Sequence, residues 1–562
     1  MKKKLLGRKR VVAVSMALVL AMGLSGCGSE KSDDKHNSDV FGQIEGASNE
    51  EIYEGIKDDV TYTNEGISYD AVAAVEGETT VGYDGYEEIE DYNTNEFEAI
   101  TENQWTSVAN SPFSTFAADV DTASYATLRS DIVNGYEIYE SAIRIEEMIN
   151  YFHYDYEDPM DGEKFGVYTE YAECPWNKDT QLALIALNTE DIDFSEAPAS
   201  NIVFLIDTSG SMYDADKLPL VQQSLTMLAE NLTEKDRVSI VTYAGSETVV
   251  LEGASGDDYY EISSAIEGLE AYGSTNGSAG IETAYSIAEK YFIEGGNNRV
   301  ILATDGDLNV GVTSESELEE LIVEKKKTGV YLSVLGFGYG NYKDNKLETL
   351  ADKGNGNYSY IDSTFEAKRA LVDEMGANLV TVAKDVKLQV EFNPALVKGY
   401  RLIGYENRTM ATEDFNDDTK DGGEMGAGHT VTAIYEIIPV DSDMDIEFTE
   451  SKYSSTDESI YEGNQYNDEL FTLNVRYKEP DEDESKLSTY VCKTSNFTGK
   501  GSDNLRWAAS VAAFGMYLKD SEYMGNTDIN LILELATSVS DHDEDEYKAE
   551  FISLVETYGD NN

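Results

Sequence analysis

The stretch Ile202-Val203-Phe204-Leu205-Ile206-Asp207-Thr208-Ser209-Gly210-Ser211 decides the fold class of this chain. Its first half is an unbroken apolar run, which predicts a strand buried on both faces, as in a parallel α/β sheet. Its second half carries oxygen-bearing side chains at alternate positions, Asp207, Ser209 and Ser211. Open α/β sheets bind ligands at the carboxyl ends of their strands. Oxygen ligands without His or Cys favour Mg²⁺, Mn²⁺ or Ca²⁺ over zinc or copper.

The pattern D-x-S-G-S resembles the metal-ion-dependent adhesion site (MIDAS) of von Willebrand factor type A (VWA) domains. Gly273-Ser274-Thr275-Asn276-Gly277 and Thr304-Asp305-Gly306 resemble the two other loops of that site. The resemblance implies a metal centre made of Asp207, Ser209, Ser211, Thr275 and Asp305. It also implies that hydroxyls contact the metal, that the aspartates act largely through water, and that a partner's carboxylate completes the coordination. Mg²⁺ is the expected metal, with Mn²⁺ and Ca²⁺ as alternatives.

Asp207 has two other interpretations. Asp207 or Ser209 could simply form a strand-end turn and cap the following helix. A phosphoryl-transferring aspartate of the haloacid-dehalogenase type needs a second acidic residue two positions later. This chain has Ser209 there, which argues against phosphoryl transfer by Asp207.

The N-terminal 26 residues predict a lipoprotein signal peptide. Six Lys and Arg residues precede an apolar segment, Val11 to Leu24, that is too short to span a bilayer comfortably. Leu24-Ser25-Gly26-Cys27 resembles the bacterial lipobox, which implies lipid attachment at Cys27. We therefore expect an extracytoplasmic protein held to the bacterial cell membrane by a lipid anchor only.

The charge of the chain is strongly acidic, with 109 Asp and Glu against 41 Lys and Arg, a net of −68. Such a charge argues against binding to nucleic acid or to an anionic membrane face. Residues 27–105 combine this acidity with few apolar residues, which predicts a flexible stalk. An acidic partner would meet a repulsive field, so a metal would have to provide the local attraction.

The rest of the chain changes its pattern twice. From residue 198 to 382 strands and helices alternate, which predicts a doubly wound, mostly parallel, Rossmann-like sheet. Strands predicted at 165–190 and 386–477 alternate as in an antiparallel sandwich. We expect these two sets of strands to form one β-sandwich into which the α/β domain is inserted, with flanking helices.

Four further segments resemble bacterial YfbK-type VWA lipoproteins over most of the chain: DVDTASYATLR, RIEEMINYF, LGFGYGNYKDNKLETLADKGNGNYSYID and DNLRWAASVAAFGMYL. The resemblance implies an N-terminal VWA-associated module, a VWA domain and a C-terminal domain of unknown function. The predicted boundaries are a signal peptide at 1–26, a stalk at 27–105, an N-terminal module at 106–197, the VWA domain at 198–382, a β domain at 383–490 and a helical region at 491–562.

Several smaller features have competing interpretations. Cys174 and Cys492 lie on either side of the predicted insertion. They could form a disulfide or remain two isolated buried thiols. Asp119 and Asp121 could bind a metal, but helix capping and turn formation explain them better. The acidic loop 414–421 lacks the glycine and glutamate of a calcium loop, so a solvated turn is expected.

These observations predict a non-enzymatic surface lipoprotein that binds a protein partner through a divalent metal in its VWA domain. The site offers no second metal, histidine base or additional nucleophile for hydrolysis. The alternative is an envelope assembly or scaffolding factor that acts on a neighbouring membrane complex.

Overall fold

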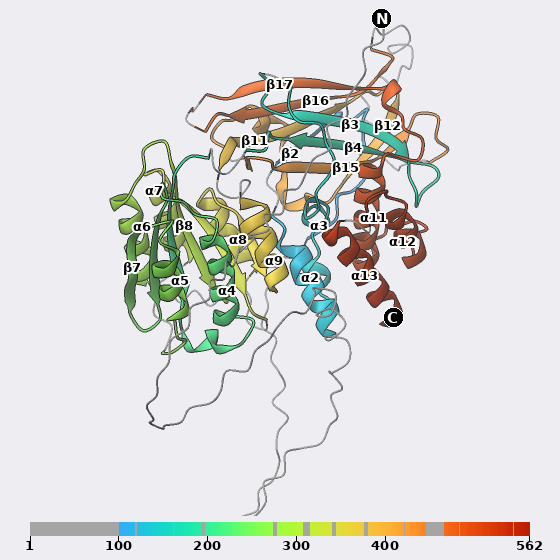
Figure 1. Cartoon of the computed structure of the whole chain (residues 1–562). Coiled ribbons are helices and arrows are strands. Elements are labelled where there is room, and N and C mark those ends of the chain that lie inside the picture. Colours follow the sequence, from blue (N-terminus) through green and yellow to red (C-terminus); the bar gives the residue numbers. More distant parts are fainter. Residues whose placement is uncertain are drawn as a thin grey trace, which may run out of the picture. The chain divides into compact units, whose positions relative to one another are not determined.

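The apolar run forms the centre of a six-stranded sheet in the computed structural model of the chain (Figure 1). All eight residues of this strand, β5 (Ser200–Asp207), are buried. β5 pairs in parallel with β6 (Arg237–Tyr243) and β8 (Asn297–Thr304). The sheet is completed by β9 (Tyr331–Phe337), β10 (Tyr358–Ile361) and β7 (Glu247–Ser255), in the order β10-β9-β8-β5-β6-β7. Only β7, at one edge, runs antiparallel to its neighbour.

Helices cover both faces of this sheet, as the alternation of strands and helices predicts. One apolar core joins the sheet to α4 (Leu218–Ala229), α5 (Tyr259–Glu267) and α9 (Thr364–Lys368) with its π-helical continuation η3 (Arg369–Asp373). The core on the opposite face involves α6 (Ser278–Lys290), α7 (Glu315–Lys326) and α8 (Asp344–Lys353). The predicted doubly wound α/β fold is therefore confirmed.

The structure describes residues 100–118, 121–160, 162–192, 197–273, 278–306, 315–339, 344–375, 380–420, 422–444, 466–480, 482, 484–542 and 545–561. The predicted signal peptide, Cys27 and the stalk up to residue 99 lie outside these ranges, as do Asp119 and Thr275. Within the described ranges, no helix has the length and apolar character needed to cross a membrane.

Two antiparallel sheets form the predicted β-sandwich. The first has the order β1 (Thr106–Ser107), β12 (Val397–Ile403), β15 (Thr430–Pro439), β4 (Gln181–Asn188), β3 (Gly166–Glu173). The second has the order β13 (Thr409–Met410), β2 (Phe113–Ala117), β11 (Thr381–Phe392), β16 (Glu469–Lys478), β17 (Lys486–Lys493), with β14 (Gly423–Gly426) beside β11. Strands from before and after the α/β domain pair directly, β4 with β15 and β2 with β11, which confirms the predicted insertion.

The two chain segments that connect the sandwich to the inserted domain lie next to each other. On the way in, the carbonyl of Glu190 accepts a hydrogen bond from the amide of Gly428. On the way out, the carbonyl of Val380 accepts one from the amide of Ala427, the neighbouring residue. The two covalent connections between the inserted domain and the sandwich are therefore adjacent.

A layer of helices covers the outer face of the first sheet. It consists of α2 (Ala123–Asn134), α3 (Ile145–Asn150), α11 (Asp503–Leu518), α12 (Ile529–Thr537) and α13 (Glu546–Asn561). Trp507, Val511 and Phe514 of α11 pack there with Phe551 of α13, as the helical periodicity of both segments predicts. Helices from both ends of the described chain thus share one core (Figure 1).

Cys174 and Cys492 are free thiols, so the disulfide interpretation is wrong and the alternative of two buried thiols holds. The physical reason is that the two side chains lie in different cores. Cys174 belongs to the core under the helices, whereas Cys492 belongs to the core between the two sheets. Burial raises the pKa of each thiol to about 12.

Because only the thiolate is reactive, both cysteines should resist alkylation in the folded protein. We expect iodoacetamide at neutral pH to leave Cys174 and Cys492 unmodified, and to modify both once the protein is unfolded in urea. Mass spectrometry of the tryptic peptides measures this. Modification only after reduction of the unfolded chain would instead indicate a disulfide.

Candidate functional site

The predicted metal residues of the first loop lie together at the carboxyl end of β5. The Asp207 side chain is fully buried, and its Oδ1 accepts a hydrogen bond of 2.8 Å from the amide of Ser209. The hydroxyls of Ser209 and Ser211 lie 2.9 Å apart. Backbone contacts hold the loop in place, because Gly210 donates to the carbonyl of Gly273 over 3.1 Å. The first and second predicted loops are therefore neighbours.

The simpler interpretation of this loop holds only in part. The bond from the Ser209 amide to Asp207 is a local turn contact of the kind that Asp often makes. Neither Asp207 nor Ser209 caps a helix, because the short helix η2 (Gly210–Tyr213) and α4 both begin without a side-chain cap. The second carboxylate oxygen of Asp207, Oδ2, is buried and has no hydrogen-bond partner among the described residues.

Asp305 reaches the same end of the sheet from β8, where only 2% of its surface is exposed. Its Oδ2 accepts a hydrogen bond of 3.0 Å from Nζ of Lys217, which is itself buried. Lys217 is the residue before α4, and its side chain turns toward the site. Lys217 is therefore a site residue that the sequence did not reveal.

The glycine-rich segment after β9 explains how Lys217 is held. Gly338 has a φ of +77°, and a Cβ atom at this position would lie 2.4 Å from Cε of Lys217. The carbonyl of Gly338 accepts a hydrogen bond of 3.1 Å from the Tyr360 hydroxyl. Only glycine lets the backbone approach the lysine so closely in this conformation. The segment thus packs against a buried ion pair.

These residues fit a divalent cation. An orphaned carboxylate oxygen and two adjacent hydroxyls at a strand end are the hard donors that Mg²⁺ prefers. Among the described residues, no group of three or more His, Cys, Asp and Glu side chains could hold a metal. The predicted metal centre is not a group of this kind, because most of its donor side chains are the hydroxyls of Ser and Thr. Asp207, Ser209, Ser211 and Asp305 would hold the ion, whereas Thr275 lies outside the described residues.

Burial has an electrostatic consequence for the metal-free site, since it raises the pKa of Asp207 to about 6. The folded state then binds a proton that the unfolded state releases near the ordinary pKa of 3.8. The free energy of unfolding of the metal-free protein therefore decreases as the pH rises from about 4 to about 6. At neutral pH the buried, ionised carboxylate destabilises the metal-free fold.

Asp207→Asn should consequently stabilise the metal-free protein at pH 7, by about 1–3 kcal/mol, because it removes a buried charge. At pH 4 the difference should disappear, since the wild-type carboxyl is then protonated. Urea unfolding at both pH values in EDTA measures the effect. A variant that is less stable than wild type at pH 7 would contradict it.

Asp121 does not have the capping role that the sequence suggests. Thr122 occupies the N-cap position of α2, but no side chain caps this helix. Asp121 instead accepts a hydrogen bond of 3.1 Å from the amide of Tyr358 in β10 and forms an ion pair with Arg408 over 3.2 Å. The sequence-based expectation is wrong because the Asp121 side chain connects the N-terminal module to other parts of the fold.

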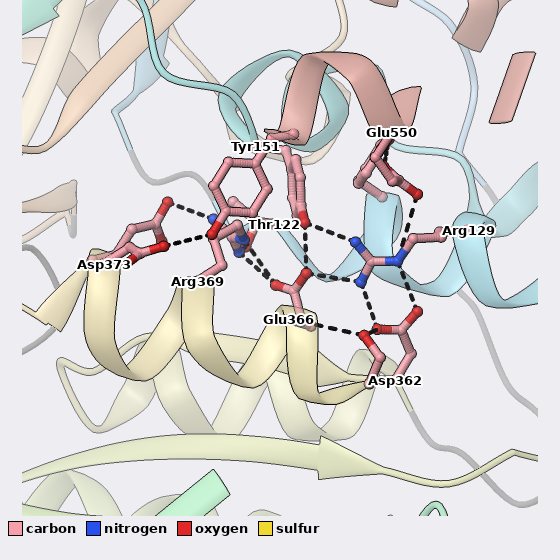
Figure 2. Close-up of polar contacts among 12 residues, drawn as sticks. Thr122, Arg129, Tyr151, Asp362, Glu366, Arg369, Asp373 and Glu550 are labelled. Atoms are coloured by element: carbon pink, nitrogen blue, oxygen red, sulfur yellow. Dashed lines mark hydrogen bonds and ion pairs between the residues drawn. The ribbon is translucent and has the colours of Figure 1, made fainter. Parts of the chain in front are cut away.

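A second polar cluster lies where α2, α3, α9 and α13 meet (Figure 2). Arg129 of α2 donates to Asp362 over 2.9 Å, to Glu366 over 2.9 Å and to the Tyr151 hydroxyl over 2.8 Å. Arg369 donates to the other oxygen of Glu366 over 2.9 Å and lies 4.1 Å from the centre of the Tyr151 ring. We call these five residues the Arg129 cluster.

The charges of the Arg129 cluster compensate each other. Burial alone would raise the pKa of Glu366, yet Arg369 and Arg129 hold it below its ordinary value. Glu550 of α13 adds a carboxylate 4.0 Å from Arg129. Asp362 and Glu366 belong to the inserted domain, whereas Arg129 and Glu550 belong to the helical layer. The cluster therefore connects the inserted domain to the helical layer.

Comparisons with known proteins agree with this architecture. The profile of the von Willebrand factor type A domain matches residues 201–374, and a profile described as "von Willebrand factor" matches residues 91–184. The profile described as "Uncharacterized protein YfbK, C-terminal" matches residues 377–560. Each profile thus covers a different part of the chain.

The protein YfbK of Escherichia coli K12 is 41% identical over 475 residues, which are 82% of this chain and 81% of that protein. Human inter-alpha-trypsin inhibitor heavy chain H4 is 29% identical over 147 residues, 25% of this chain and 16% of that protein. Among solved structures, a von Willebrand factor type A protein from Catenulispora acidiphila is 15% identical, with a TM-score of 0.38 over 70% of this chain and 89% of that one. The chain belongs to the YfbK family of VWA-domain proteins.

Proposed function

We propose that this protein binds a protein partner through a divalent metal ion held by Asp207, Ser209, Ser211, Thr275 and Asp305, with Mg²⁺ as the metal. The partner contributes an acidic side chain to the metal, and no chemical reaction follows. The resemblance of Leu24-Ser25-Gly26-Cys27 to a lipobox supports the further proposal that the protein lies outside the cytoplasm, anchored by lipid at Cys27. The observation that carries the proposal is the buried Oδ2 of Asp207, which lacks a hydrogen-bond partner among the described residues.

Lys217 supports the same proposal through its charge. The two carboxylates of the site would nearly neutralise a divalent cation, but Lys217 already pairs with Asp305. The occupied site would therefore keep a net positive charge and attract a carboxylate. This local attraction matters because the chain as a whole is strongly acidic, with a net charge of −68.

A pull-down from native membrane and surface extracts tests the proposal. The full chain, purified in mild detergent, is used in Mg²⁺ and in EDTA, beside Asp207→Ala and the double variant Ser209→Ala with Ser211→Ala. Ser264→Ala, on the exposed side of α5, is the matched control. We expect a partner that only wild type and the control retain, and only with Mg²⁺.

The same experiment distinguishes the alternative role in envelope assembly. A partner retained equally in EDTA and by both site variants would contradict metal-mediated binding. Binding would then have to involve the sandwich or the helical layer, as expected of a scaffolding factor.

A further inference from the structure

Two exposed tyrosines border the candidate metal site. Tyr213 directly follows the serine loop in η2, and 79% of its surface is exposed. Tyr272 is 68% exposed, and its amide donates a hydrogen bond of 2.9 Å to the carbonyl of Thr208, the residue after Asp207. Both rings thus belong to loops that hold the predicted ligands.

A third tyrosine of this border comes from the N-terminal module. Tyr136 follows α2 and stacks on Tyr339, with ring centres 4.0 Å apart and an interplanar angle of 12°. Tyr339 directly follows Gly338, which packs against Lys217. Tyr136 remains 43% exposed. The surface around the metal site is therefore built by two modules and not by the VWA domain alone.

The charged residues of this border are all acidic. Asp214 and Asp216 are exposed beside Tyr213, and Glu137 is exposed beside Tyr136. The described segments 133–137, 208–216, 244–247 and 272–273 contain no Lys or Arg. A partner segment made only of acidic residues would be repelled there, whereas Lys and Arg would find both carboxylates and aromatic faces.

From this complementarity we infer that the partner presents its carboxylate from a segment in which Lys or Arg flanks the acidic residue. The inference rests on the proposed function, since the carboxylate binds at the metal. The basic neighbours contact the border formed by Tyr213, Tyr272 and Tyr136 with Asp214, Asp216 and Glu137. The border thus selects among the many proteins that carry exposed acidic side chains.

Three matched peptides test this selectivity against the immobilised full chain. Each has a single central Asp, flanked on both sides by Lys, by Ser or by Glu, and is presented on streptavidin so that avidity compensates for weak single-site binding. In Mg²⁺ we expect the Lys-flanked peptide to bind about tenfold more tightly than the Ser-flanked peptide, and the Glu-flanked peptide to bind weakest. High salt should reduce the differences.

Variants show whether the tyrosines are responsible. Tyr213→Ala and Tyr272→Ala should each weaken binding of the Lys-flanked peptide about threefold, as loss of an exposed cation–π contact does. Tyr136→Ala should weaken it similarly, and Tyr136→Phe should not. Tyr260→Ala is the matched control, because Tyr260 is 82% exposed but lies in the first turn of α5, after β7 has led the chain away from the site.

Each outcome decides a different question. Equal Mg²⁺-dependent binding of all three peptides would overturn the inferred selectivity and leave the proposed function intact. Preference for the Lys-flanked peptide that persists in EDTA and in Asp207→Ala would overturn the placement of the carboxylate at a metal, and with it both proposals. Absence of binding by every peptide would overturn the inferred partner class, while the pull-down still decides the proposed function.

Discussion

Arg129→Met is expected to lower the free energy of unfolding by about 3–5 kcal/mol, because it takes the ion-pair partner from the buried carboxylate of Asp362 and leaves Glu366 paired with Arg369 alone. Arg129 pairs with Asp362 and Glu366, whose side chains are 8% and 1% exposed. Methionine preserves most of the apolar stem, so the loss is mainly electrostatic. Urea unfolding at neutral pH, followed by tryptophan fluorescence, measures the change.

Two comparisons isolate the cause. Arg476→Met removes a partner of the exposed Asp418 and should change stability by no more than about 1 kcal/mol. Adding Asp362→Asn to Arg129→Met should recover part of the loss, since the buried carboxylate that paired with Arg129 is then neutral. Equal effects of Arg129→Met and Arg476→Met would mean that the Arg129 cluster is not what connects the inserted domain to the helical layer.

Lys217→Met is expected to have two opposite effects. The metal-free protein should lose about 3–5 kcal/mol of stability, because the buried carboxylate of Asp305 loses its ion pair with Lys217. Affinity for Mg²⁺ should rise about fivefold or more, since even a charge screened by water contributes about 1 kcal/mol at 4 Å. Unfolding in EDTA and isothermal titration with Mg²⁺ measure the two quantities.

Binding of the partner should respond differently from binding of the metal. Without Lys217 the occupied site loses its positive charge, so retention of an acidic partner should fall although Mg²⁺ binds more tightly. Lys290→Met, which removes an exposed pair with Glu252, serves as the control. A parallel loss of metal and partner would instead indicate that Lys217 only maintains the structure of the loop.

The elements that the sequence predicted well are those specified by short, local patterns. β5 and the serine loop follow one another without a gap, so the apolar run and the hydroxyls are recognisable together. The insertion was predictable because the spacing of apolar residues changes twice along the chain. The strand pairs β4–β15 and β2–β11 then follow from the need of each strand set to bury one face.

The parts that could not be predicted depend on charged residues far apart in the chain. Lys217 is 88 residues from Asp305, and Arg129 is 237 residues from Glu366. Nothing local distinguishes these basic residues from the solvent-exposed ones, since each lies in or beside an ordinary helix. The two cysteines show the same limit, because only the completed sandwich determines which core each strand position faces.

The adjacent connections of the inserted domain have a consequence for the order of folding. Thr189 and His429 are in contact although 240 residues separate them. Closing so long a loop of unfolded chain costs roughly 5 kcal/mol of entropy by the (3/2)RT ln n relation. A VWA domain that has already folded holds the residues around Glu190 and Val380 close together and removes most of that cost. The sandwich therefore nucleates efficiently only after the domain inserted into it has folded, and a defect in that domain delays maturation of the whole chain.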